Sequence, residues 1–401
     1  MAKRILFACE LGNGVRQAEQ IVPVAAGLIA AGHEVRVAVP PDVAAVPILR
    51  AAGLTVLDAP AWRAEPPPGF LASTYADVLL VIGYATQDAL WGMLRGWAAV
   101  LSAAAPDLVF AALAPTAMLA SRIAGLPVAT IGDGYALPPP AEPLPSMRPW
   151  AEVPAEYFLS AEGRVLPVIN ACLRADGAEP LLSLADLFAT EASYLCCFPE
   201  LDHYEGRGEA DYCGQVFGAS PGSGFAWPPG TAERVFVAMD GRHRPFRALL
   251  NALAALGLPT VVQATGISDE EAAALERPGL LVHAATLDRS AALADCDIVA
   301  CQDIGMVGPA LLASRPVLLL PDPIEQMMVL HRLARQGLGH GVPPDADADA
   351  VGAVVRRLLD DTATRRRVAN FARSYHGYSP ALATDAIIGN CSPHPCDRLG
   401  G

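Results

Sequence analysis

The feature that most constrains the fold is a unit of buried strand, glycine-bearing loop, helix and second strand at the start of the chain. The first strand covers residues 4–9, and the loop runs from Glu10 to Gly14. Apolar residues at helical spacing predict a helix over 18–31, and the next strand follows at 33–39. Such a β-α-β unit belongs to a parallel sheet with its loop at the carboxyl end of the first strand. An α/β domain is therefore expected.

The same alternation continues along the first half of the chain. Further strands are predicted at 54–57, 107–111 and 128–131, and helices at 75–104 and 115–124. A doubly wound parallel sheet accounts for this order, whereas a β-sandwich does not.

Residues 218–230 divide the chain, because glycine, proline and serine dominate there and the periodicity is lost. Strand and helix patterns then restart at Val235. With 401 residues, the chain is long enough for two domains. We expect two Rossmann-like domains that face each other across a cleft. The predicted boundaries are 1–217 for the first domain, 218–230 for the linker, 231–388 for the second domain and 389–401 for a tail.

Charge and hydropathy exclude some classes of function. A net charge of −14 argues against a nucleic-acid partner, because that role requires a basic surface. No apolar run is long enough to span a bilayer, and the N-terminus lacks the apolar region of a signal peptide. A cytoplasmic protein is expected, and its oligomeric state stays open.

The nine cysteines are odd in number and irregularly spaced, which favours reduced, buried thiols over a disulfide framework. Cys391, His394 and Cys396 lie close together in the tail but form no recognised ligand set. No metal is predicted.

A second stretch of strand, loop and helix lies at 299–326. Its strand ends at Cys301, and a helix is expected to begin near Gly305. The first N–H groups of a helix are unpaired and attract anions, so this arrangement predicts a phosphate or nucleotide site.

Several runs resemble the GT-B-fold glycosyltransferases of the macrolide and UDP-glycosyltransferase type. They are ELGNGVRQAEQIVPVAAGLIAAGHEVRVAVP, PTAMLASRIAGLPVATIGDGYALPP, CFPELDHY and ALLASRPVLLLPDPIEQ. The resemblance extends to about residue 388. It implies inverting transfer of a sugar from a nucleotide diphosphate sugar, expected to be UDP- or dTDP-linked, to a small-molecule acceptor. The first domain would hold the acceptor and the second the donor, with no further cofactor.

The chain departs from this family at the catalytic base. The family carries Gly-His after the first strand, and the matching positions here are Arg16 and Gln17. Glutamine cannot accept a proton, and a positioned base contributes roughly 10²- to 10⁴-fold. Glu10 and Asp133 each follow a predicted strand and are the candidate substitutes. The competing interpretation is that both carboxylates bond loop N–H groups. We read His203 as structural.

The diphosphate-binding loop is also altered. The family's HGGxGT-like loop corresponds to Cys301, Gln302, Asp303, Ile304, Gly305 and Met306, of which only Gly305 is kept. Asp303 places a negative charge where the resemblance implies an anion. Alternatively, Asp303 caps the following helix.

Other candidate donor contacts lie elsewhere in the chain. Glu325 and Gln326 match the pair that, in the family, hydrogen-bonds the donor sugar. Arg242 and His243 follow the strand at 235–239 and are read either as diphosphate ligands or as a solvated basic loop. The remaining candidates are the loop glycines Gly12 and Gly14.

Two further functions stay open. One is a catalytically inactive relative that binds a ligand or activates a partner, because both halves of the expected site are altered. The other is different chemistry with Cys301 as a nucleophile, its thiol pKa lowered by a helix N-terminus.

Overall fold

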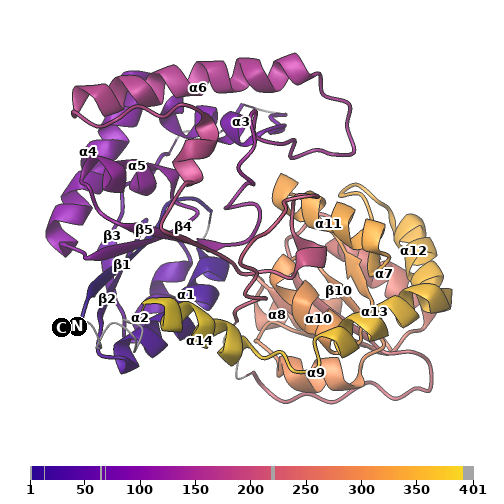
Figure 1. Cartoon of the computed structure of the whole chain (residues 1–401). Coiled ribbons are helices and arrows are strands. Elements are labelled where there is room, and N and C mark those ends of the chain that lie inside the picture. The colour runs from indigo at the N-terminus through magenta and orange to yellow at the C-terminus, as the bar shows by residue number, and fades with distance from the viewer. Residues whose placement is uncertain (1, 13, 64–65, 68, 218–221, 392–401) are drawn as a thin grey trace. The chain divides into compact units, whose positions relative to one another are not determined.

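The computed structural model describes residues 2–12, 14–63, 66–67, 69–217 and 222–391. Its contacts divide the chain into two compact units. The first unit is Met1–Gly218 together with Ser379–Gly401, and the second is Ala219–Tyr378. Each unit has its own sheet and its own helices (Figure 1).

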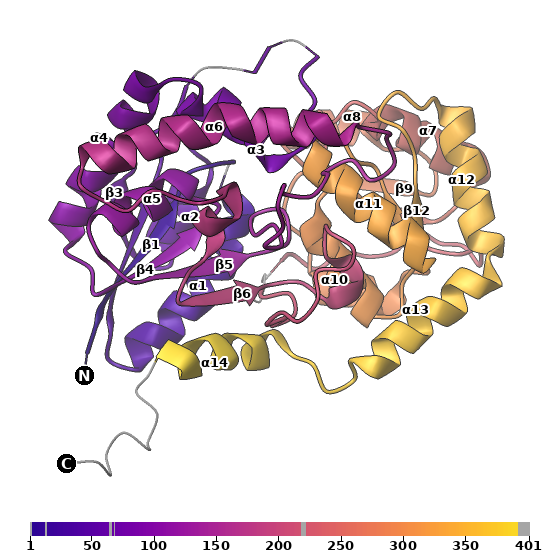
Figure 2. The same ribbon diagram turned by 45° about the horizontal axis from the view of Figure 1, so that its top comes forward.

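The first unit contains a six-stranded parallel sheet in the order β3-β2-β1-β4-β5-β6. Its strands are β1 (Arg4–Cys9), β2 (Glu34–Val39), β3 (Thr55–Asp58), β4 (Leu108–Ala112), β5 (Val128–Gly132) and β6 (Ala192–Leu195). Its helices are α1 (Val15–Ala30), α2 (Ala45–Ala51), α3 (Tyr75–Leu79), α4 (Gln87–Ala104), α5 (Pro115–Ile123), α6 (Ala155–Ala175) and α14 (Pro380–Cys391). Helices α4, α5 and α6 lie on one face of the sheet, and α1, α2 and α14 on the other (Figures 1 and 2).

The central strands are buried on both faces, as expected where helices cover both sides of a parallel sheet. Strands β4 and β5 are almost entirely buried, and in β1 only Arg4 is exposed. Strand β1 pairs with β4 in a register that places Cys9 opposite Ala112. The loops that follow these two strands therefore begin side by side.

The helix predicted over 75–104 is interrupted. After α3 the chain kinks within Leu80–Tyr84, where Ile82 and Gly83 leave the helical conformation, and α4 starts at Gln87. Gly83 adopts φ 104°, which a residue with a side chain rarely does, and Thr86 caps α4 by accepting the N–H of Ala89. The apolar spacing runs through this break, so periodicity alone did not predict it.

The second unit repeats the plan with the order β12-β11-β10-β7-β8-β9, again entirely parallel. Its strands are β7 (Val235–Asp240), β8 (Thr260–Thr265), β9 (Leu280–His283), β10 (Ile298–Cys301), β11 (Val317–Leu319) and β12 (Gly339–Gly341). Its helices are α7 (Phe246–Leu256), α8 (Asp269–Leu275), α9 (Arg289–Asp295), α10 (Val307–Leu312), α11 (Ile324–Gln336), α12 (Ala348–Asp360) and α13 (Thr362–Ser374).

The last helix differs from the predicted domain boundary. Helix α14 falls within 231–388 for most of its length, yet it belongs to the first unit, where it packs on α1. Gly27 of α1 makes room for this contact, because a Cβ there would lie 2.1 Å from Cδ1 of Ile388. The predicted tail begins inside α14, and residues 392–401 lie outside the described part of the chain.

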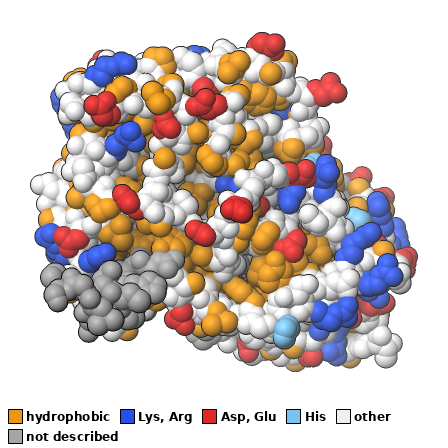
Figure 3. All heavy atoms as spheres, in the orientation of Figure 1, with side chains coloured by type: hydrophobic (Ala, Val, Ile, Leu, Met, Phe, Trp, Pro, Cys, Tyr) orange, Lys and Arg blue, Asp and Glu red, His pale blue; other side chains and the backbone are white. Residues whose placement is uncertain are grey.

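No helix among the described residues is both long and apolar enough to cross a membrane. Lys and Arg side chains gather on the surface of the second unit where α12 and α13 lie (Figure 3). Arg365, Arg366 and Arg367 of α13 are all exposed, as expected for a solvated helix face.

The predicted linker contributes to the second unit. Ser223 donates its N–H to the carbonyl of Thr286, and its own carbonyl accepts the N–H of Asp288. A Cβ on Gly222 would lie 2.0 Å from the backbone carbonyl of Leu287, so this close approach requires glycine.

We expect Gly222→Ala to lower the free energy of unfolding by about 1–3 kcal/mol, because backbone rather than a mobile side chain must move. Gly224→Ala is the matched control, since nothing lies within 4 Å of a Cβ at that position. Chemical denaturation of both variants measures the difference. Equal stabilities would contradict the packing account.

Candidate functional site

Polar side chains gather at the carboxyl edge of the first sheet. Glu10 directly follows β1, Thr116 lies in the first turn of α5 after β4, and Asp133 directly follows β5. Because β1, β4 and β5 are adjacent and parallel, the three residues come to one edge. This is the edge at which open α/β sheets bind ligands.

Asp133 is ion-paired with Arg16, whose Nη1 lies 3.0 Å from Oδ2 of the carboxylate. The backbone N–H groups of Tyr135 and Ala136 donate to Oδ1 at 3.1 and 3.4 Å. Burial raises the pKa of Asp133, but Arg16, His203 and the backbone donors outweigh burial and leave the pKa below its ordinary value. Asp133 is therefore held as a stabilised carboxylate, which is a weak base.

Gln17 is buried and serves the loop. Its Nε2 donates to the carbonyl of Leu11 at 3.4 Å. With Gln20, Arg16 and Asp133 it lines a crevice of about 10 Å³, which has room for about one water molecule. The side-chain amide at the predicted base position thus stabilises the loop.

The two loop glycines have conformational roles. Gly12 has φ 81°, and Gly14, at the start of α1, has φ 73°. A Cβ on Gly14 would lie 2.8 Å from Cβ of Ala45 in α2. Both positions favour glycine without any ligand, and their assignment as donor contacts stays a prediction.

Glu10 has a different environment from Asp133. Its Oε2 accepts the N–H of Thr116 at 2.8 Å, whereas its Oε1 is buried without a hydrogen-bond partner. Burial raises the pKa of Glu10 to about 7 despite the donors at Thr116 and Ala117. The hydroxyls of Thr116 and Tyr84 are 3.0 Å apart. Sequence reasoning missed Thr116 and Tyr84, because the contact between Glu10 and Thr116 spans 106 residues.

His203 is buried, with a relative exposure of 2%, and neither ring nitrogen has a hydrogen-bond partner among the described residues. Its ring centroid lies 6.1 Å from that of Tyr135. The neighbouring Asp202 is buried and forms a hydrogen-bond network with the partly buried Arg207 and Tyr212. The network fixes the loop in which His203 stands.

In the second unit, Asp303 caps the turn that follows β10. Its Oδ1 accepts the N–H of Gly305 at 2.9 Å, at the start of a short 3₁₀ turn over Ile304–Met306. The α-helix itself begins only at Val307 and has six residues. The capping interpretation of Asp303 thus agrees with the geometry, and the helix predicted to begin near Gly305 begins later because the cap starts a tighter turn. Met306 is buried, and Gly305 is also inaccessible.

Cys301 and Gln302 both contribute to the structure of the second sheet, Cys301 by its burial and Gln302 by a hydrogen bond. Oε1 of Gln302 accepts the N–H of Asp240 at 3.1 Å and so links the ends of β10 and β7. Cys301 is fully buried, and burial raises the pKa of its thiol far above its ordinary value. The expectation of a lowered thiol pKa was wrong, because desolvation disfavours the thiolate and no long helix starts beside it.

The basic residues of the loop after β7, Arg242 and His243, bond other residues of the protein. The guanidinium of Arg242 donates to the carbonyl of Gly266 at 2.8 Å and pairs with Glu271 at 3.2 Å. Nε2 of His243 lies 2.9 Å from the carbonyl oxygen of Leu320, to which it donates. His243 therefore joins the ends of β7 and β11, and Arg242 is directed towards α8.

Glu325 and Gln326 lie in the first turn of α11. Oε1 of Gln326 accepts the N–H of Asp322 at 3.1 Å, and Glu325 is half-buried. The ends of β7, β10 and β11 are adjacent in the sheet, so they gather the predicted donor residues at one edge of this unit.

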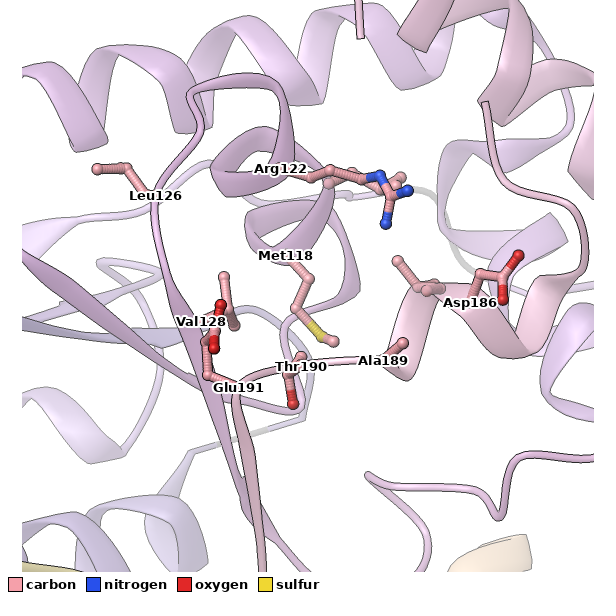
Figure 4. A pocket seen from close by; sticks show the side chains of 10 residues that line it. Met118, Arg122, Leu126, Val128, Asp186, Ala189, Thr190 and Glu191 are labelled. Carbon is pink, nitrogen blue, oxygen red and sulfur yellow. The ribbon is translucent and has the colours of Figure 1, made fainter. Parts of the chain in front are cut away.

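A larger cavity, of about 370 Å³, lies at the opposite edge of the first sheet, where β5 begins (Figure 4). Met118 and Arg122 of α5 point into it, and Asp186 and Glu191 stand across from them (Figure 4). Oδ2 of Asp186 is engaged by the N–H groups of Leu182 and Ser183. This cavity lies at the amino ends of the strands, whereas the candidate site lies at their carboxyl ends, so the two are separate.

No protein-family model and no curated protein matches the chain. Solved structures do. CalG4, the calicheamicin glycosyltransferase, is 21% identical over 98% of this chain and 100% of its own, with a TM-score of 0.70. The glycotransferase of kitacinnamycin is 17% identical over 98% and 100%, with a TM-score of 0.69. The spinosyn rhamnosyltransferase SpnG, complexed with thymidine diphosphate, is 21% identical over 96% and 99%, with a TM-score of 0.68.

The prediction of two Rossmann-like α/β domains of the GT-B type is thereby confirmed. The chain has the two-domain α/β fold of GT-B glycosyltransferases over nearly its whole length, with one Rossmann-like parallel sheet in each unit.

We expect Asp133→Asn to lower the free energy of unfolding at neutral pH by about 1–3 kcal/mol, because the ion pair between Asp133 and Arg16 is lost. The folded-state pKa of Asp133 is below its unfolded value. Its contribution is therefore present above about pH 4 and is lost as the pH falls through the folded-state pKa. Denaturation of wild type and variant at neutral and acidic pH measures the difference, which should shrink in acid.

Asp107→Asn is the control, since Asp107 pairs with Arg4 on the surface and both partners are well exposed. Its effect should be much smaller. A difference between wild type and Asp133→Asn that is the same at both pH values would contradict the ion-pair account.

Proposed function

We propose that the protein transfers a sugar, with inversion, from a nucleoside diphosphate sugar to a hydroxyl group of a small-molecule acceptor. The observation that carries the proposal is the likeness in fold, over nearly the full length, to glycosyltransferases that include SpnG complexed with thymidine diphosphate. SpnG is also known complexed with spinosyn aglycone, and that structure is 21% identical to this chain. A UDP- or dTDP-linked donor is proposed accordingly.

The second unit is the proposed donor-binding part. Glu325 offers a carboxylate that accepts hydrogen bonds from two hydroxyls, and Gln326 offers an amide that both donates and accepts. Both follow β11 at the carboxyl edge of the sheet. This combination suits the neighbouring hydroxyls of a sugar ring.

The diphosphate would be bound differently from the pattern that the resemblance implies. Asp303 already occupies the N–H of Gly305, and Arg242 is paired with Glu271. His243 is the remaining basic candidate at this edge, and its Nε2 is held by Leu320. Weak affinity for the diphosphate is therefore part of the proposal.

The second candidate function is a catalytically inactive GT-B relative that binds a ligand or activates a partner. The observation that favours it is that the side chains of Gln17, Gln302 and Asp303 all bond backbone groups of the protein itself. Such contacts stabilise the site without requiring turnover.

Two measurements separate these functions. Calorimetry with UDP, dTDP and GDP and their sugars tests donor binding, and mass spectrometry of donor and acceptor mixtures tests transfer. Binding with product formation supports the enzyme. Binding without product over a broad acceptor panel supports the inactive relative, and no binding at millimolar ligand contradicts the donor site.

We expect Glu325→Gln to weaken binding of the nucleotide sugar by about 10-fold, because a hydrogen bond to a charged group contributes about 1.5–3 kcal/mol and the amide replaces it only in part. Binding of the nucleoside diphosphate alone should be unchanged. Asp322→Asn, which changes an exposed carboxylate in the loop just before α11, is the control. Equal weakening of both ligands by Glu325→Gln would argue against a contact to the sugar.

A further inference from the structure

The first unit contains a buried carboxylate oxygen that nothing in the fold uses. Oε1 of Glu10 has no hydrogen-bond partner among the described residues, and the side chain has a relative exposure of 6%. Buried polar atoms are satisfied in the great majority of cases, so each exception requires an explanation. The explanation here begins with the way in which the carboxyl is held.

One oxygen of Glu10 is fixed and the other is not. Oε2 accepts the N–H of Thr116 at 2.8 Å in the first turn of α5, a helix of nine residues. Pro115 precedes it and has no N–H, so Thr116 offers the first donor of this helix. The contact orients the carboxyl group and leaves the lone pairs of Oε1 for another donor.

The groups around Glu10 are uncharged. The phenols of Tyr75 and Tyr84 face it, and burial raises the pKa of both well above the ordinary value, so both stay protonated. The hydroxyl of Tyr84 is engaged with that of Thr116. No ion pair involves Glu10 in the described part of the chain, in contrast to Asp133 with Arg16.

We propose that Oε1 of Glu10 accepts the proton of the acceptor hydroxyl during sugar transfer, in place of the base that is absent at Gln17. This inference rests on the proposed function. In the step, the acceptor O–H bond breaks and its proton moves to Oε1. The acceptor oxygen bonds to the anomeric carbon, whose bond to the diphosphate oxygen breaks, and the nucleoside diphosphate leaves with that electron pair.

The environments of Glu10 and Asp133 favour Glu10 as the general base. A general base is most effective when its pKa lies near the operating pH, and that of Glu10 is raised to about 7. The pKa of Asp133 is lowered, and both of its oxygens are occupied. Glu10 has a free oxygen and Asp133 does not.

The test is Glu10→Gln, which preserves size and the contact to Thr116 but cannot take a proton. With a donor and acceptor that wild type converts, kcat/KM should fall by roughly 10²- to 10⁴-fold. For wild type, kcat/KM should rise to a plateau as the pH increases through about 7, since the carboxylate is the active form. The variant should lack this rise, and its affinity for the nucleotide sugar should be unchanged.

Two further variants exclude a merely structural effect. Glu162→Gln removes another carboxyl of the same unit whose pKa is raised by burial, and it should retain the rate and the pH profile of wild type. Glu10→Asp keeps a titrating carboxyl but withdraws it, so the rate should fall while the rise with pH persists. Infrared difference spectra should show a carboxyl that titrates near pH 7 in wild type and is missing in Glu10→Gln.

The outcomes separate this inference from the proposed function. If wild type forms product and Glu10→Gln keeps the rate and the pH profile, Glu10 is not the base, although the protein is a transferase. A carboxyl at position 10 that titrates only below pH 5 overturns the inference as well. If wild type binds nucleotide sugars but forms no product over the panel, transfer itself fails, and the role of Glu10 fails with it.

Discussion

Parallel pairing of the strands is the constraint on which the candidate site depends. In a parallel sheet every strand ends at the same edge. The pairing register alone therefore brings residues that are far apart in sequence together at that edge. In the first unit, the pairing of Cys9 with Ala112 places the loop after β1 beside the start of α5. In the second unit, the adjacent ends of β7, β10 and β11 meet in the same way. Which polar side chains at each edge are available to a ligand then depends on which of them already bond the backbone of the loops.

Several polar side chains at these edges bond the backbone of the loops and strand ends around them. The amide of Gln302 links two strands, the carboxylate of Asp303 caps a turn, and the amide of Gln17 bonds the loop that precedes it. Each such contact gives a partly buried backbone group a side-chain partner, and a typical hydrogen bond of this kind contributes about 0.5–1.5 kcal/mol to stability. These side chains therefore help to hold the loops in which they lie.

The sequence was sufficient to predict the fold but only part of the site. The alternation of buried strands and amphipathic helices predicted both sheets, because both periods are local properties. The break at Gly83 lies inside an unbroken apolar pattern, which hides it. The place of α14 depends on its contact with α1, which local patterns do not report. The same limit applies to Glu10 and Asp133. Both follow strands, and only their partners, Thr116 in one case and Arg16 in the other, separate them chemically.

The buried side chain of Glu10 costs the fold free energy, because one of its oxygens has no hydrogen-bond partner among the described residues. A buried carboxyl with an unpaired oxygen destabilises a fold, whereas an apolar side chain after β1 would pack without that penalty. Natural sequences break local rules of this kind mainly at functional sites, where the penalty is offset elsewhere in the structure. Gln17 and Asp303 break no such rule, since both are satisfied by their own loops. The unsatisfied oxygen therefore sets Glu10 apart from Gln17 and Asp303, and it is the reason for proposing Glu10 as the base.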